Sequence, residues 1–92
     1  MKLDWDEFKK QINFKKHGLD FEDAGLVFQG KTVTFEDNRQ DYSEQRLITL
    51  GLLKGRCVVV VHTPRKGFTR IISMRKANER EKAIYQKRLE EN

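Results

Sequence analysis

The sequence predicts a single α+β domain over residues 1–92, with two N-terminal helices, a small antiparallel sheet of three to four strands and a C-terminal helix. Two observations support this fold class. Apolar residues recur at helical spacing up to residue 30, and apolar runs separated by short turn sequences follow between residues 46 and 74. A hydrophobic content of 37% in 92 residues supplies one modest core.

The first helix is predicted to begin at Asp4, with Glu7 completing a capping box. Its core-facing stripe is predicted to hold Trp5, Phe8 and Ile12, which favours packing over stacking on nucleic-acid bases. Gly18 ends this helix after a basic last turn. Asp20 then caps a second, shorter helix that ends at Gly30 and completes a helical hairpin. The apolar face of the second helix is Phe21, Ala24, Val27 and Phe28.

Strand patterns follow the helices. The predicted strands are residues 31–35, 46–53, 56–63 and 68–74. A polar loop covers residues 36–45, Lys54 and Gly55 form a two-residue hairpin turn, and residues 64–67 form a four-residue turn. The last helix is predicted to start at Asn78, with Glu81 at the third position, and to run to about Leu89. Its thin apolar face is Ala83, Ile84 and Leu89.

The turn lengths predict which residues face each other across the sheet. The expected pairs are Arg46 with Thr63, Leu50 with Val59, and Val61 with Arg70. One face is then expected to be the core: Ile48, Leu50, Leu52, Val59, Val61, Ile72 and Met74, with Arg46 and Arg70 near one end. The other, more polar face is expected to line a cleft: Thr49, Gly51, Val58, Val60, His62, Thr69, Ile71, Ser73 and Arg75. A slip of one residue would exchange the two faces.

Charge is divided unevenly along the chain. Residues 1–45 hold 7 Lys/Arg against 10 Asp/Glu, whereas residues 46–92 hold 12 against 4. A basic half favours nucleic acid, an anionic surface or an acidic protein as partner, and solubilising charge is the alternative. No apolar run approaches the roughly 18 residues of a membrane span, and the N-terminal ten residues lack a signal-peptide core, so a cytoplasmic protein is expected.

Neither a disulfide nor a metal site is expected. Cys57 is the single cysteine and lies in an apolar run, which favours a buried hydrophobic role over a reactive thiol. Cys57, His17 and His62 do not have the spacing of metal ligands. No cofactor is predicted.

Three arginines lie at positions that usually disfavour cations. Arg70 and Arg75 fall in or beside the last strand, and Arg80 falls in the first turn of the last helix. Cleavage of RNA without a metal requires stabilisation of a negatively charged phosphorane, which the planar fork of arginine can provide. The alternatives are structural. Glu79 and Glu81 would neutralise Arg80, and Glu44 or Glu81 would pair with Arg70.

Four blocks in order along the chain carry a family resemblance: "NFKKHG", "FEDAGLVF", "EQRLITLG" and "RIISMRKANEREKAIY". Together they resemble the BrnT family of type II toxin-antitoxin ribonucleases, distant members of the RelE/ParE-like superfamily. The resemblance implies a RelE-like fold and a metal-independent endoribonuclease that inhibits translation and growth. It also implies a cognate BrnA-like ribbon-helix-helix antitoxin, a heterotetrameric complex, and contact with operator DNA only through the antitoxin.

The resemblance adds candidate site residues to the arginines. Tyr85 matches a family tyrosine and is a candidate acid, base or stacking group, or else a packing aromatic. Lys16 and His17 belong to the "KHG" block and are candidate RNA-backbone contacts or simple helix-end residues. Arg46, with Glu44, belongs to an E-x-R block and is a candidate RNA contact, with a salt bridge to Glu44 favoured over a chemical role. His62 is a candidate proton-transfer residue on the sheet, with a scaffold role as the alternative.

Two other function classes use the same basic half. A non-catalytic nucleic-acid-binding module needs the positive charge but no acid and base. A protein-interaction domain would dock its basic face on an acidic partner. Cleavage of RNA in the presence of a chelator would distinguish a metal-independent ribonuclease from these two classes.

Overall fold

The computed structural model describes residues 1–91 and has nine elements of secondary structure. In chain order they are β1 (Leu3–Trp5), α1 (Glu7–His17), the 3-10 helix η1 (Phe21–Asp23), α2 (Ala24–Gln29), β2 (Val33–Glu36), β3 (Leu47–Leu53), β4 (Arg56–Arg65), β5 (Phe68–Lys76) and α3 (Glu79–Glu90). The strands form one sheet in the order β1-β5-β4-β3-β2. The predicted α+β class is therefore confirmed, with a larger sheet than expected.

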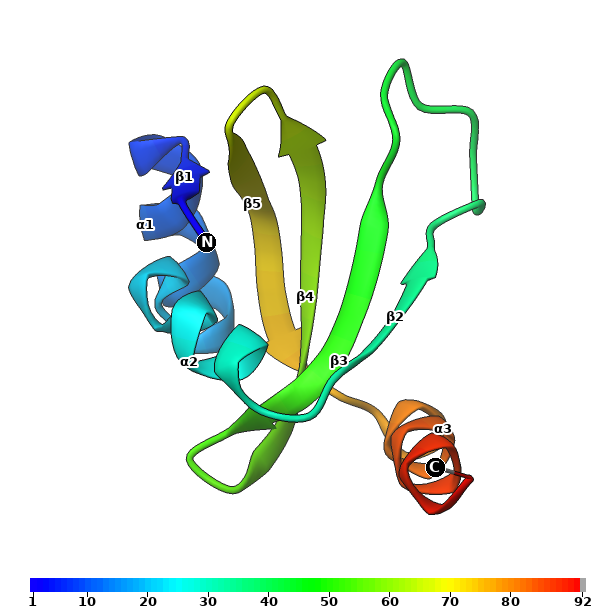
Figure 1. The fold of residues 1–92 in the computed structure, drawn as a ribbon. Coiled ribbons are helices and arrows are strands. Elements are labelled where there is room, and N and C mark those ends of the chain that lie inside the picture. Colours follow the sequence, from blue (N-terminus) through cyan, green and yellow to red (C-terminus); the bar gives the residue numbers. More distant parts are fainter. Residues whose placement is uncertain (92) are drawn as a thin grey trace.

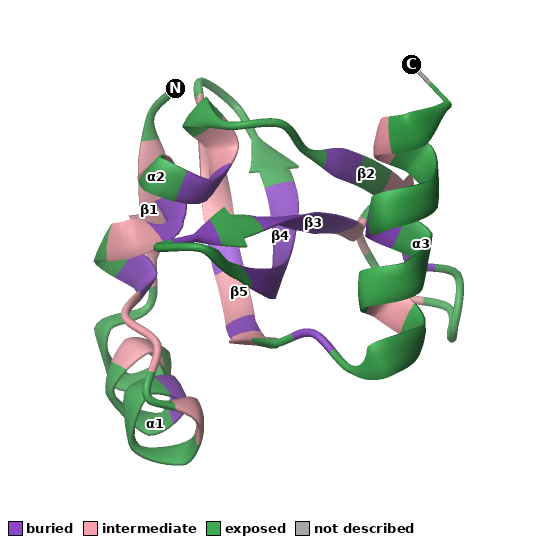
Figure 2. Ribbon diagram, turned by 90° about the horizontal axis from the view of Figure 1, so that it is seen from below, coloured by how far each residue is buried: buried purple, intermediate pink, exposed green. Residues whose placement is uncertain are grey.

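The helices lie on opposite sides of this sheet. Figure 1 shows α1 and α2 on one side and α3 on the other, and Figure 2 shows the same arrangement from below. Each side has its own buried cluster. We call the side under the N-terminal helices the α2 face, with Leu53, Val58, Val60, Ile71 and Met74 packed on Phe21, Ala24 and Val27. The other is the α3 face, with Val33, Ile48, Leu50, Cys57, Val59 and Val61 packed on Ala77 and Tyr85.

The N-terminus forms a strand where the sequence predicts a helix start. Strand β1 pairs in parallel with residues 69–71 of β5. The other three strand pairings of the sheet are antiparallel. The helix cap is Asp6, whose carboxylate accepts the backbone N–H of Lys9 at 3.0 Å. The prediction of Asp4 as the cap was wrong. Asp4 belongs to β1 because it pairs with β5, and that strand is too distant in the sequence to be seen in a local pattern.

Helix α1 turns its apolar residues to solvent. Phe8 is 71% exposed and Ile12 is 51% exposed, so the predicted core-facing stripe was wrong for both, although Trp5 packs against the α2-face core. The buried residue of α1 is Asn13. Its side-chain amide donates to the carbonyl of Met74 at 2.9 Å and its side-chain oxygen accepts the N–H of Met74 at 3.2 Å. Asn13 thus satisfies the backbone hydrogen-bonding groups of Met74, at the edge of β5 where β1 no longer pairs with it.

The other helix predictions hold in part. Gly18 caps α1 with a φ of 71°, and the Asp20 side chain accepts the N–H of Glu22 at the start of η1, as predicted. Asn78 and Glu81 form the predicted capping box of α3. The inward residues of α3 are Tyr85 and, partly, Leu89, whereas the predicted Ala83 is exposed.

The first hairpin has the predicted register and the second does not. Lys54 and Gly55, both with positive φ, connect β3 to β4, and Leu50 lies opposite Val59. The second turn was predicted with four residues, but Arg65 pairs with Phe68, so only two residues form it. Arg70 therefore lies opposite Thr63, and the predicted pairing with Val61 was wrong.

A β-bulge in β5 changes the predicted faces. The pairing shifts between Val61 and His62, so that Ile72 is an extra residue on β5. Beyond this bulge the alternation reverses: Met74 packs in the α2-face core and Arg75, opposite Val59, lies on the α3 face. The expected polar cleft on the other face is absent among residues 1–91, because α2 covers it. A side chain at Gly51 would lie 2.7 Å from Val27, which shows how closely α2 approaches.

Candidate functional site

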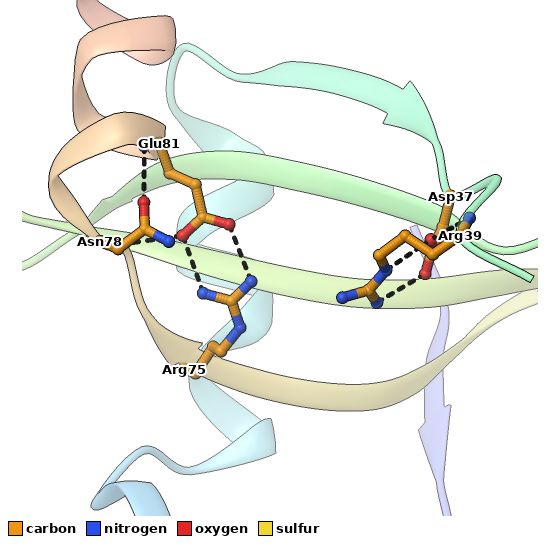
Figure 3. Close-up of polar contacts among 5 residues, drawn as sticks. All are labelled: Asp37, Arg39, Arg75, Asn78 and Glu81. Atoms are coloured by element: carbon orange, nitrogen blue, oxygen red, sulfur yellow. Dashed lines mark hydrogen bonds and ion pairs between the residues drawn. The ribbon is translucent and has the colours of Figure 1, made fainter.

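The part of the α3 face that α3 does not cover is lined by arginines. Arg46 and Arg70 lie on this face by strand alternation, two positions from Ile48 and Ile72. Arg75 lies on it opposite Val59. The half-buried apolar residues Phe35 and Ile72 pack against the buried cluster of the same face. We call this surface the arginine face. It also includes Arg39, from the loop between β2 and β3 (Figure 3).

Arg75 is held by α3. Its two terminal nitrogens donate to the two carboxylate oxygens of Glu81, each at 2.8 Å (Figure 3). Glu81 is fixed in turn because its carboxylate accepts the N–H of Asn78 at 3.0 Å. The hydrogen bonds from Arg75 lower the pKa of Glu81, which keeps this carboxylate ionised at neutral pH. The capping box therefore also positions a guanidinium at the edge of α3.

A second arginine pair lies on the loop between β2 and β3. Arg39 donates from Nε and Nη2 to the two oxygens of Asp37, both at 2.8 Å, and Tyr42 donates to the same carboxylate at 3.3 Å. Figure 3 shows this pair on the same side of the sheet as Arg75 and Glu81. The charge of Arg39 contributes to the lowered pKa of Glu81, which places the two pairs within electrostatic range. Sequence reasoning missed Arg39, because the loop has no periodicity.

Arg46 stacks on an aromatic ring instead of forming the predicted salt bridge. Its guanidinium carbon lies 4.1 Å from the centroid of Tyr42. Glu44 pairs with Arg65 at 3.1 Å, so the expected Glu44 to Arg46 bridge was wrong. The Nε of Arg46 is buried and has no hydrogen-bond partner among residues 1–91. Arg46 thus retains donor capacity within the arginine face.

Arg70 pairs with the N-terminal strand. Its Nη2 donates to Asp4 at 2.6 Å. The predicted partners, Glu44 and Glu81, pair with Arg65 and Arg75 instead, so that prediction was wrong. Asp4 reaches Arg70 because Leu3 and Trp5 on either side of it point to the α2 face. The Nε of Arg70, like that of Arg46, is buried without a partner among the described residues.

The remaining cationic candidates lie at the border of the arginine face. Arg80 is exposed in the first turn of α3, and its guanidinium forms no ion pair within residues 1–91. Glu79 and Glu81, the expected neutralising residues, pair with Lys82 and Arg75 instead. Lys16 and His17 lie in the last turn of α1, beside a pocket of about 220 Å³ that Ile72 of β5 also lines.

Two predicted proton-transfer residues lie elsewhere. His62 is buried on the α2 face, where its Nε2 lies 2.7 Å from the Thr49 hydroxyl and its ring packs edge-on to Phe28. Burial lowers the pKa of His62, which favours the neutral ring. Tyr85 is buried under α3 and donates to the carbonyl of Lys31 at 2.8 Å, and burial raises its pKa. Both side chains are therefore buried and engaged with partners other than the arginines.

The Asp37 carboxylate is expected to make stability depend on pH. The hydrogen bonds from Arg39 lower the pKa of Asp37 from 3.8 to about 2. Because the folded state binds its proton less readily than the unfolded state, this stabilisation is complete above pH 3.8 and is lost as the pH falls towards 2. Urea unfolding of wild type and Asp37→Asn between pH 5 and pH 2 measures how the free energy of unfolding falls with pH. We expect a shallower acid slope for Asp37→Asn, and equal slopes would contradict this assignment.

Residues 1–91 contain no group of three or more His, Cys, Asp and Glu side chains arranged to hold a metal ion. None of the helices in this part of the chain has the length and apolar content needed to span a membrane.

The comparison with protein families decides which class of protein this is. The family model described as "Ribonuclease toxin, BrnT, of type II toxin-antitoxin system" matches residues 5–81. The chain belongs to the BrnT family. It is therefore a ribonuclease toxin of a type II toxin-antitoxin system, as the sequence blocks predicted. A comparison with curated proteins found no match.

Membership of the BrnT family supplies two partners for the surface described above. A ribonuclease has an RNA substrate, and a type II toxin has a cognate antitoxin. The matched region ends at Glu81, so it includes every arginine with a described carboxylate partner and the first turn of α3.

Proposed function

We propose that this BrnT chain, acting as one domain, cleaves RNA at the arginine face without a metal. The observation that supports it is that four arginines lie on one side of the sheet. Arg70 and Arg75 share one face of β5, Arg39 lies on the same side as Arg75 (Figure 3), and Arg46 stacks on Tyr42, which donates to the same Asp37 carboxylate as Arg39. Two of these arginines have a buried Nε that lacks a partner among the described residues. A phosphodiester would accept hydrogen bonds from these groups.

The chemistry of the proposal needs three steps at one phosphate. The 2′-hydroxyl loses a proton, its oxygen attacks the phosphorus, and the 5′-oxygen leaves with a proton. Arg75 would stabilise the charge of the phosphorane once the phosphate displaces Glu81 from its two terminal nitrogens, because that fork matches two phosphate oxygens. Glu81 is the candidate proton acceptor in this proposal, since its ionised carboxylate lies 2.8 Å from that guanidinium.

The other arginines have supporting roles in the proposal. Arg39 would bind the same reacting phosphate as Arg75, Arg46 would bind a phosphate next to it, and Arg70 would do so at the β1 edge. Arg80, Lys16 and His17 would add charge along the border of this surface. Both His62 and Tyr85 are left out of the catalytic set, because each is buried and hydrogen-bonded to its own partner, Thr49 for His62 and the carbonyl of Lys31 for Tyr85.

The antitoxin side of the proposal follows the family resemblance. We propose a BrnA-like ribbon-helix-helix antitoxin, a heterotetrameric complex and contact with operator DNA only through that antitoxin. The cytoplasm is the proposed location, because the RNA targets of translation are found there. Static light scattering of the purified complex measures its mass directly, and a mass of one chain of each kind would contradict the heterotetramer.

The cleavage proposal is tested with labelled RNA in excess EDTA. We expect fragments that end in a 2′,3′-cyclic phosphate, since the 2′-oxygen displaces the 5′-oxygen. Cleavage that appears only after Mg²⁺ is added would contradict the metal-free mechanism. RNA that binds but stays intact under both conditions would instead favour a non-catalytic binding module.

A further inference from the structure

Helix α1 has an apolar patch that its own fold does not cover. Phe8 and Ile12 are four residues apart, so they lie next to each other on the helix surface, and both are more than half exposed. The side of α1 that packs on the sheet instead holds Asn13, which binds Met74. A surface helix normally buries its apolar stripe, so the reversed arrangement here indicates that another molecule covers it.

The surroundings of this patch are basic. Lys9, Lys15 and Lys16 are exposed on the turns around Phe8 and Ile12. The one nearby lysine that points elsewhere is Lys10, which pairs with Glu22 at 2.9 Å. The pocket of about 220 Å³ beside Ile12 is lined by Lys9, Asn13, Lys16, His17, Ile72 and Ser73. An apolar side chain of a partner fits the size of this pocket.

We propose that the α1 patch, made of Phe8 and Ile12 with Lys9, Lys15 and Lys16 around them, binds the cognate antitoxin. The segment that docks there offers apolar side chains flanked by Asp or Glu, which complement the exposed apolar pair and the lysines. This inference rests on the antitoxin that membership of the BrnT family implies. It does not depend on the proposed cleavage chemistry.

Charge and side-chain type favour this occupant over two others. A second copy of the chain would bring lysines against lysines in a protein of net charge +5. RNA would stack on Phe8, but Ile12 has no aromatic ring and cannot act as a stacking platform. An i, i+4 pair of large apolar residues is instead typical of a protein docking on a helix.

The test is the affinity of the antitoxin for Phe8→Lys/Ile12→Lys. Isothermal titration uses the purified cognate antitoxin and the 92-residue chain. We expect a loss of about 100-fold in affinity, because large apolar anchors dominate interfaces of this kind. Both positions face solvent, so thermal unfolding of the free variant is expected to match wild type. Leu52→Lys is the matched control, since Leu52 is 46% exposed and lines the groove between α3 and the β3–β4 hairpin.

Several results would overturn the proposal. One is unchanged antitoxin affinity in the double variant, and another is a loss caused by Leu52→Lys instead, which would place the antitoxin on the α3 groove. Weaker RNA binding with unchanged antitoxin affinity would assign the patch to RNA. A wild-type dimer that the double variant dissociates would assign it to a second copy. Because titration measures binding alone, a failure of the nuclease proposal would leave this result interpretable.

Discussion

Replacing Arg75 with alanine is expected to lower the rate of RNA cleavage by about 100- to 1000-fold, the usual effect of removing one donor from a charged transition state. Arg75 is singled out because both of its terminal nitrogens are aligned in one plane by Glu81, at 2.8 Å each. Glu81 occupies both nitrogens in this structure, so a phosphate that binds the same fork has to take the place of this carboxylate. Cleavage of a labelled oligonucleotide under single-turnover conditions measures the rate.

Controls separate chemistry from folding in this prediction. Arg75→Lys keeps a positive charge beside Glu81 but lacks the planar fork, so we expect a folded protein that still loses most of its activity. Arg65→Ala removes another strand arginine with a carboxylate partner, Glu44, and is expected to keep the wild-type rate. Wild-type activity in a folded Arg75→Ala protein would contradict the role assigned to this side chain.

Replacing Phe21 with alanine is expected to reduce the free energy of unfolding by about 3 to 5 kcal/mol. Phe21 has no exposed surface and lies in the α2-face core, between the N-terminal helices and the sheet. Removing its ring leaves a cavity that the surrounding strands cannot fill, because β4 and β5 are fixed by their pairing. Urea unfolding followed by circular dichroism measures the change.

The same substitution at Phe14 provides the comparison for Phe21. Phe14 is 55% exposed on α1, so Phe14→Ala is expected to change the free energy of unfolding by less than about 0.5 kcal/mol. Equal losses for the two variants would show that the core does not depend on Phe21 in the way its burial suggests.

Local signals made parts of the fold predictable. The turn at Lys54 and Gly55 follows from the backbone angles that these two residues allow, so the pairing of Leu50 with Val59 could be derived. The caps at Gly18 and Asn78 are equally local. By contrast, β1 depends on pairing between Asp4 and Arg70, and no local pattern encodes so distant a contact.

One extra residue explains most of the errors in the predicted faces. Because the bulge inserts Ile72, the alternation after it is reversed, and Arg75 lies on the α3 face rather than beside His62. An uninterrupted period of two could not reveal this shift. The prediction that Phe8 and Ile12 face the core was wrong, because periodicity groups residues on one side of a helix but does not say which side packs on the sheet.

The candidate site was partly within reach of the sequence. Arg70 and Arg75 stood out because strand positions disfavour cations, and both do lie on the arginine face. Arg39 was missed, although the loop holds Asp37, Arg39, Tyr42 and Arg46 within ten residues, and such alternation of charges with an aromatic residue was the available signal. His62 was predicted on the correct face, but the cleft expected there is absent because α2 covers this face and its Phe28 packs against the His62 ring.

A double-mutant cycle between Arg39 and Arg75 tests most directly whether the arginine face acts on one phosphate. The rates of cleavage are compared for wild type, Arg39→Ala, Arg75→Ala and the double variant under single-turnover conditions. If both guanidiniums bind the same reacting phosphate, the loss in the double variant is smaller than the product of the two single losses. Losses that simply multiply would mean that the two arginines act independently, and the shared site proposed here would be wrong.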